Sequence, residues 1–133
     1  SGAHVIFQAA GPAGNAVFTA AKDINTGLNA GSKDKAWVIG VDMDQNDQGN
    51  YKTKDGKSDN LTLTSSLTGI GRGVQLVTEA AQKDKFPGGK QLVYGLDDKG
   101  VAVTRGNMSD EAWQAVQAAQ KKIVDKEITV PSK

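Results

Sequence analysis

The chain has 133 residues, of which 38% are hydrophobic and 23% charged, enough for one domain or for part of a larger protein. Its 16 basic and 15 acidic residues give a net charge of +1, which argues against a nucleic-acid surface. With no cysteine and a single histidine, His4, the chain excludes disulfides, thiol catalysis and a histidine-rich metal site.

The N-terminal part predicts the start of a βαβ unit. Residues 5–10 are a predicted strand, residues 11–15 form a glycine-bearing turn, and a helix follows. Glycines let a ligand approach the backbone, and the start of a helix presents free N–H groups. Gly11 and Gly14 do not match the dinucleotide fingerprint, however, and Pro12 lacks an N–H donor. A ligand loop and a plain packing turn both remain possible.

Residues 37–41 (WVIGV) are almost wholly apolar and do not alternate with polar residues. This pattern predicts a central strand of a parallel sheet, buried on both faces and joined to the first strand by a right-handed crossover. Ligands of open α/β sheets bind beyond the carboxyl ends of the strands, so Asp42 is a candidate ligand-binding residue, with a simple turn cap as the alternative. Asp42 and Asp44 would share one face of a continuing strand, but no third metal ligand is evident.

The middle of the chain predicts surface segments followed by another strand. Residues 25–35 are polar and indicate a surface connection, and residues 44–60 indicate an excursion loop with a small hairpin whose turn is the Lys-Asp-Gly-Lys of residues 54–57. Residues 61–67 alternate apolar and hydroxyl side chains, which is typical of a strand with one wetter face.

The C-terminal half predicts two helices and a hairpin. Ile70, Val74, Val77 and Ala81 have the spacing of a helix buried on one side. Residues 91–96 and 101–104 flank a glycine-bearing turn and predict a hairpin. A helix capped by Ser109 follows, and residues 128–130 predict a short final strand.

Five stretches occur together in a specific order and spacing. They are VIFQAAG, WVIGVDMDQ, LTSSL, FPGG and ITVP, at residues 5–11, 37–45, 63–67, 86–89 and 128–131. In combination they resemble the basic membrane protein family, also called the PnrA-like family. The resemblance covers nearly the whole chain and is closest to Gram-positive members, which carry a similar Lys-Asp-Gly-Lys loop.

The resemblance implies a non-enzymatic, cofactor-free, nucleoside-binding component of an ABC importer. Members of the family are lipoproteins with two α/β lobes of the type I periplasmic-binding-protein-like fold around a cleft. They are longer than this chain, which is therefore expected to be a C-terminal part. Residues 1–67 would be mostly the βαβ unit of the second lobe, and residues 68–133 would pack partly on the missing first lobe.

The same resemblance implies the partners and the location of the protein. The partners would be a nucleoside, the missing N-terminal lobe or a second copy of the chain, and an ABC permease. No signal peptide is visible in the chain, so an export signal would have to lie upstream. The intact protein is expected to be an extracytoplasmic, cell-surface lipoprotein, anchored through the absent N-terminus, of a Gram-positive bacterium.

The resemblance assigns roles to four residues. Asp42 matches the family's Gly-Val-Asp aspartate, which accepts hydrogen bonds from ribose hydroxyls, and Gly11 matches the loop glycine near the ligand. Pro12 replaces the family's usual second glycine. Thr68 stands where many members have a lysine that helps to hold the ribose. Both departures bear on which nucleoside, or which other ligand, is bound. Arg72 is the only nearby basic residue that could substitute for the lysine, although a place on a solvated helix face is the more ordinary interpretation of it.

Two other classes of protein remain open from the residues alone. A ligand-sensing regulator lobe would share the two-lobed fold, and a DNA-binding helix upstream would support it. A receiver-like phosphoacceptor domain could use Asp42 and Asp44 for magnesium, although receivers carry that acid pair on their first strand.

Overall fold

The computed structural model describes residues 2–131, and the chain divides into two compact units. The first unit comprises Ser1–Leu67 and Val103–Ser109, and the second comprises Thr68–Ala102 and Asp110–Lys133. No helix among the described residues has both the length and the apolar character needed to cross a membrane.

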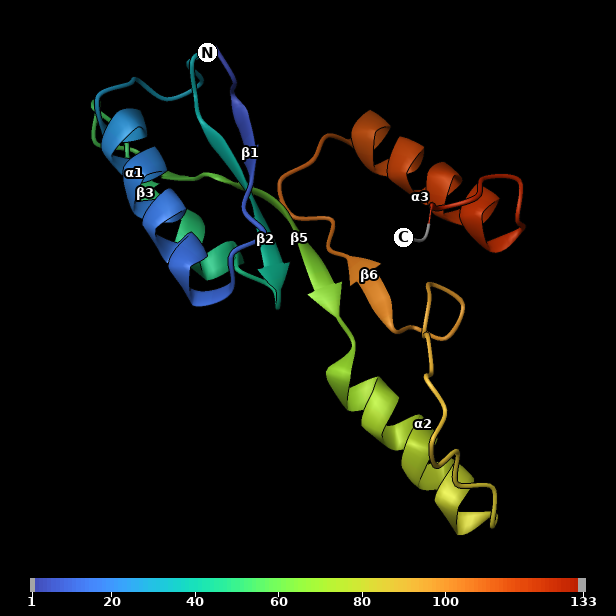
Figure 1. Ribbon diagram of the computed structural model, residues 1–133. Coiled ribbons are helices and arrows are strands. Elements are labelled where there is room, and N and C mark those ends of the chain that lie inside the picture. Colours follow the sequence, from blue (N-terminus) through green and yellow to red (C-terminus); the bar gives the residue numbers. More distant parts are fainter. Residues whose placement is uncertain (1, 132–133) are drawn as a thin grey trace. The chain divides into compact units, whose positions relative to one another are not determined.

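A largely parallel sheet organises the first unit (Figure 1). Its strand order is β1-β2-β5-β6, where β1 is Val5–Phe7, β2 is Trp37–Asp42, β5 is Thr62–Thr68 and β6 is Val101–Val103. The boundary between the two units passes through the end of β5 and through β6. Strand β2 pairs in parallel with both β1 and β5. The predicted α/β class is therefore confirmed, as is the parallel pairing of the first two strands.

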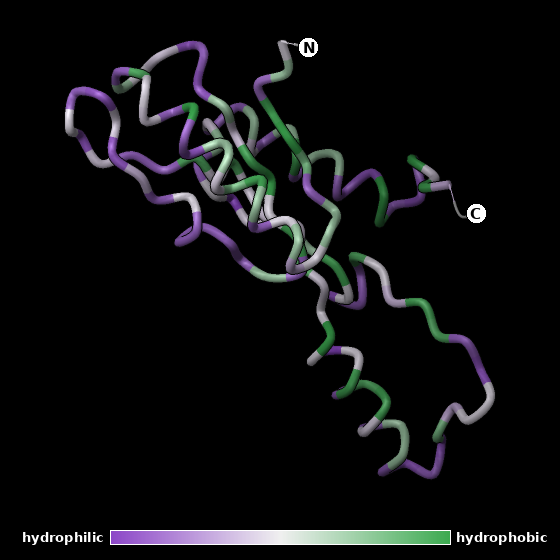
Figure 2. The backbone as a smooth tube through the Cα atoms, turned by 60° about the vertical axis from the view of Figure 1, so that its left-hand side comes forward, coloured by the Kyte–Doolittle hydropathy of each residue, from purple (hydrophilic) through white to green (hydrophobic). Residues whose placement is uncertain are grey.

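Helix α1 (Asn15–Thr26) covers one face of this sheet and forms the core with it (Figure 1). The buried apolar side chains of this core are Phe18, Ala21, Ala36, Val38 and Leu61. The opposite face stays open, because Phe7 is 55% exposed and its neighbour Ile39 is only half-buried. Figure 2 shows β1 as a hydrophobic stretch of the trace. Within this chain the predicted burial of β2 is thus achieved on one face only.

The segment between α1 and β2 departs from the predicted surface connection at its two ends. Asn25 is fully buried in the last turn of α1, where its side chain accepts a hydrogen bond from the Ala36 N–H (2.8 Å) and donates one to the Ala36 carbonyl (2.9 Å). Lys35 is buried as well. Asn25 and Lys35 are buried because each forms hydrogen bonds in the interior, Asn25 with Ala36 and Lys35 with Asp59. A prediction from hydrophobicity alone cannot identify such partners.

The predicted excursion after β2 contains the expected hairpin. A short 3-10 helix, η2 (Asn46–Gly49), leads into β3 (Asn50–Lys52), which pairs antiparallel with β4 (Ser58–Asn60). Gly56 has a φ of 79° in the intervening turn, a backbone conformation that favours glycine.

The second unit contains α2 (Ile70–Gln82) and α3 (Asp110–Val124). The predicted hairpin is wrong, because residues 91–96 form no strand and only β6 is regular. Gly100 donates instead to the Gly95 carbonyl (2.9 Å), which closes a loop where a ladder was expected. The predicted strand at residues 128–130 does not form either.

The apolar face of α2 is not buried by the described residues. Ile70 is 70% exposed and Val74 is 62% exposed, and no residue of this helix is buried. The spacing of apolar residues predicted the helix correctly, but among the described residues its apolar face is covered only in part.

Candidate functional site

A pocket of about 230 Å³ lies at the carboxyl ends of β1 and β2 in the first unit. Its lining comes from the loop after β1, the start of α1 and the segment after β2. The lining residues are Gly11, Pro12, Asn15, Val41, Asp42, Met43, Gln45 and Gln48. Three of the four residues that the sequence singled out, Gly11, Pro12 and Asp42, therefore line one pocket.

Asp42 is the last residue of β2 and has an unusual backbone conformation. Its φ is +69°, and the N–H of Met43 donates to the carbonyl of Val41 (2.9 Å), which closes a γ-turn around Asp42. A non-glycine residue with positive φ in such a turn costs about 1–3 kcal/mol and is typical of ligand-binding and active sites. The exposed side chain of Asp42 lines the pocket from this turn, and the backbone conformation of the turn is energetically unfavourable.

The same turn separates the two acids that a continuing strand would have placed on one face. Asp44 does not line the pocket, and its carboxylate accepts the N–H of Asn46 (3.0 Å) at the start of η2. Among residues 2–131 no three acidic, histidine or cysteine side chains gather in a group that could hold a metal ion. The expectation of a shared face is therefore wrong, because β2 ends at Asp42.

The opposite wall of the pocket is formed by the short 3-10 helix η1 (Gly11–Gly14) and the first turn of α1. Gly11 has a φ of 51°, a conformation in which any side chain would be strained. Gly14 supplies no side-chain cap to α1, and the first turn of α1 carries no acidic residue. The N–H of Asn15, the first residue of α1, already donates to the Pro12 and Ala13 carbonyls, so the start of α1 contributes the partial positive charge of its helix dipole and the Asn15 side-chain amide to the pocket.

Two buried glutamines that sequence reasoning missed lie beneath the pocket. Gln45 Oε1 accepts hydrogen bonds from Gln8 Nε2 and from the N–H of Val41, both at 2.8 Å. Gln45 also lines the pocket and donates from Nε2 to Gln48 Oε1 (3.1 Å). The sequence hints only at Gln8, which directly follows the apolar strand β1, where an unpaired polar group would be costly.

Thr68, the fourth predicted site residue, ends β5 and is exposed in the second unit. It is not among the residues that line the pocket of the first unit. Arg72, considered as a substitute for the family's lysine, donates from Nε to the carbonyl of Asp98 (3.2 Å) within the second unit.

A second polar cluster lies near the amino end of β2. Lys35 Nζ contacts both carboxylate oxygens of Asp59 (2.9 Å) and lies 3.8 Å from the centre of the Trp37 ring. Tyr51 donates its hydroxyl to Asp59 Oδ2 (2.8 Å). Burial alone would raise the pKa of Asp59, but the hydrogen bonds from Lys35, Tyr51 and the Asn60 N–H outweigh it and lower that pKa. Burial, helped by Asp59, raises the pKa of Tyr51 above its usual value.

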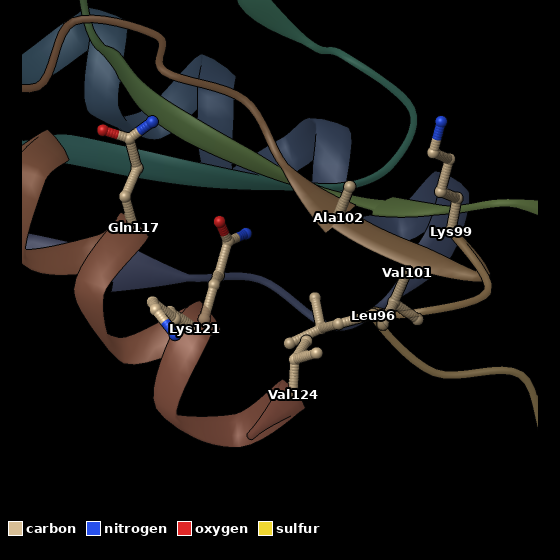
Figure 3. Close-up of a pocket in the computed structure, with 8 residues that line it drawn as sticks. Leu96, Lys99, Val101, Ala102, Gln117, Lys121 and Val124 are labelled. Atoms are coloured by element: carbon tan, nitrogen blue, oxygen red, sulfur yellow. The ribbon is translucent and has the colours of Figure 1, made fainter. Parts of the chain in front are cut away.

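Two larger pockets lie in the second unit. One, of about 550 Å³, is shown in Figure 3, where Leu96, Val101 and Val124 turn toward one another. The other, of about 530 Å³, follows the exposed face of α2. Neither is lined by an acidic side chain, so neither offers the hydrogen-bonding chemistry of the pocket beside Asp42.

Comparison with known proteins connects this geometry to a family. The model of the Bmp family, described as "ABC transporter substrate-binding protein PnrA-like", matches residues 1–133. The chain belongs to this family. The resemblance drawn from the five sequence stretches is therefore confirmed, and the mostly parallel α/β unit agrees with one lobe of a periplasmic-binding-protein-like fold.

Individual relatives are similar over almost the whole chain. It is 43% identical over 133 residues to the "ABC transporter nucleoside-binding protein BmpA" of Lactococcus lactis, covering 100% of the chain and 37% of that protein. It is 41% identical to the "CD4+ T-cell-stimulating antigen" of Listeria monocytogenes, with 100% and 37% covered, and 32% identical to "Basic membrane protein B" of Borreliella burgdorferi, with 98% and 33% covered. The chain thus spans about a third of the length of the curated relatives it matches.

Proposed function

We propose that this chain forms part of the nucleoside-binding protein of an ABC importer, and that the pocket beside Asp42 binds the ribose. The observation that carries the proposal is that the Asp42 carboxylate and the N-terminus of α1 line one pocket. A carboxylate accepts hydrogen bonds, whereas the side-chain amide of Asn15, which also lines the pocket, can donate them. The hydroxyls of a ribose can do both at once, and a relative 43% identical to this chain is named a nucleoside-binding protein.

The small size of the pocket supports a site shared with another part of the protein. At about 230 Å³ it is below the roughly 300–1,000 Å³ of a typical small-molecule site. The remaining walls, including those that hold the base, would come from the first lobe that the longer relatives have room for. Binding would then proceed by closure of two lobes around the nucleoside, without chemical conversion. Thr68, the last residue of β5, would adjust the choice of ligand.

The proposed partners and location follow from the family. An ABC permease would receive the nucleoside from the closed protein, and the missing lobe or a second copy would cover the open apolar surfaces. The protein would act outside the cytoplasm, held at the membrane through its N-terminus. The regulator and receiver alternatives gain no support, because the family is one of transport proteins and Asp42 and Asp44 do not share a site.

The test compares Asp42→Asn with Asp44→Asn in the full-length protein by calorimetric titration with purine nucleosides. Asparagine tolerates a positive φ, so the first variant removes the charge with little disturbance of the turn. Hydrogen bonds to a charged group contribute about 1.5–3 kcal/mol, so we expect nucleoside affinity to fall at least about tenfold. The Asp44 variant loses a similar charge outside the pocket and should bind as the wild type does. Equal affinity of all three proteins would remove Asp42 from the site.

A further inference from the structure

The backbone carbonyl and N–H of Val41 are both hydrogen-bonded, and these two bonds hold the turn at Asp42. The carbonyl of Val41 accepts the Met43 N–H that closes the γ-turn, and the N–H of Val41 donates to Gln45 Oε1. The Gln45 backbone is held in turn from β5, since its N–H donates to Ser65 Oγ (3.0 Å) and its carbonyl accepts the Thr62 hydroxyl (3.2 Å).

Gln8 determines which end of the Gln45 amide faces Val41. Its Nε2 donates to Gln45 Oε1, while Gln48 Oε1 accepts from Gln45 Nε2. A flipped Gln45 amide would place its NH₂ group against two other donors and its oxygen against an acceptor. The donor from Gln8 therefore keeps the Gln45 oxygen pointed at the Val41 N–H.

The backbone around the two glutamines leaves room for them. A Cβ at Gly14 would lie 1.6 Å from Gln8 Oε1, and a Cβ at Gly40 would lie 2.9 Å from both Cβ and Oε1 of Gln45. Gln8 is 4% exposed and Gln45 is 7% exposed. Gly40 in β2 and Gly14 at the start of α1 therefore leave the space that the two buried glutamine amides occupy. Close backbone approach of this kind is expected around a specific buried polar network.

We infer that Gln8 and Gln45 are positioning residues that hold Asp42 in its γ-turn for the ligand. The inference rests on the proposed role of Asp42 and deepens it. Gln8 does not line the pocket, so its effect on binding would pass through Gln45 and the Val41 N–H. Contacts with the ligand alone would not identify Gln8, because it bonds to a pocket residue without lining the pocket itself.

The test uses Gln8→Met and Gln45→Met, which keep side-chain length and remove the amide. The matched control is Asn25→Leu, because Asn25 is also a fully buried amide, bonded to Ala36 directly before β2 and thus at the end of the strand away from Asp42. Residual dipolar couplings on the full-length protein report φ at Asp42, and amide exchange on the same protein reports the Val41 and Met43 N–H groups. Calorimetry on the full-length protein reports nucleoside affinity.

We expect all three variants to lose stability but only the glutamine variants to alter the turn. In both, exchange of the Met43 amide should accelerate about tenfold more than in Asn25→Leu, and φ at Asp42 should move from its positive value. Nucleoside affinity should fall about fivefold or more in Gln8→Met, and stay within about twofold of wild type in Asn25→Leu. If Gln45→Met does not fold, Gln8→Met alone tests the inference, because it retains Gln45 Oε1 as the acceptor for the Val41 N–H.

The outcomes separate this inference from the proposed function. A wild-type protein that binds no nucleoside contradicts the proposed function, while a loosened Asp42 turn in the glutamine variants still supports the positioning role. An unchanged turn in Gln8→Met and Gln45→Met overturns the inference even if nucleosides bind. A loosened turn with unchanged affinity overturns it too, because the geometry of Asp42 would then not matter to the ligand.

Discussion

At the scale of single residues, Asp42 is notable for its backbone conformation as well as for the carboxylate that lines the pocket. Its φ of +69° would be a severe outlier for valine or isoleucine, the β-branched residues found elsewhere in β2. Among residues with side chains, aspartate and asparagine enter this conformation most readily, and only aspartate adds a charged acceptor. The choice of residue at position 42 therefore meets a conformational and a chemical requirement together.

The cluster of Lys35, Tyr51 and Asp59 makes a prediction about stability and pH. Asp59→Asn should destabilise the chain by about 2 kcal/mol at pH 7, since it leaves a buried Lys35 ammonium without its counter-charge. Because the folded state lowers the pKa of Asp59, its contribution is complete above the ordinary pKa of about 4 and is lost as the pH falls below that value. Urea unfolding at pH 7, 4 and 3 measures both effects.

In the wild type, stability should therefore decline from pH 4 to pH 3 more steeply than in Asp59→Asn. Asp34→Asn is the control, because Asp34 is an exposed acid next to Lys35 in sequence and its loss should leave the acid dependence intact. An Asp59→Asn protein whose stability falls as steeply as the wild type would contradict the assignment of this pH dependence to Asp59.

At the scale of secondary-structure elements, β2 depends on a glycine. Gly40→Ala should destabilise the first unit by about 1–3 kcal/mol, because the added Cβ would lie 2.7 Å from Ser65 Oγ and 2.9 Å from Gln45 Cβ. Gly71→Ala is the matched control in α2, where a Cβ meets no atom within 4 Å. Alanine there should stabilise the helix by about 0.5–1 kcal/mol. If denaturant unfolding showed that both substitutions change the free energy of unfolding in the same direction, this explanation would be wrong.

Local sequence pattern was sufficient to predict some of the secondary-structure elements and not others. Period and composition predicted α1, β2 and the β3–β4 hairpin, because their own residues carry the signal. The hairpin of residues 91–104 was wrong although its turn signal was good. Gly100 there packs so closely that a Cβ would lie 2.5 Å from the Cβ of Tyr94, and this contact replaces the expected ladder.

At the scale of the whole molecule, the exposed apolar surfaces predict association. Phe7 in the first unit and Ile70 and Val74 in the second are all more than half exposed, and such surfaces tend to be covered by another chain. We expect the isolated 133-residue chain to form dimers or larger species in light scattering. On the proposed function we also expect it to bind nucleosides poorly, because the other walls of the cleft would come from outside this chain. Adding the missing N-terminal part as a separate polypeptide should restore both a defined mass and nucleoside binding. A clean monomer that binds as tightly as the full-length protein would contradict this expectation.

The sequence by itself determined the α/β class, the parallel pairing of β1 with β2, the family, and the importance of Asp42 and Gly11 as candidates. Each depends on local signals: an apolar run, a glycine turn, an acid at a strand end. Only the tertiary structure decided that Gly11, Pro12 and Asp42 line one pocket, that Asp44 turns away from it, and that Gln8 and Gln45 hold the turn. The physical reason is that a buried polar side chain is stable only beside its partners, and Gln8 and Gln45 lie 37 positions apart in the chain. No pattern in the sequence encodes such a pairing.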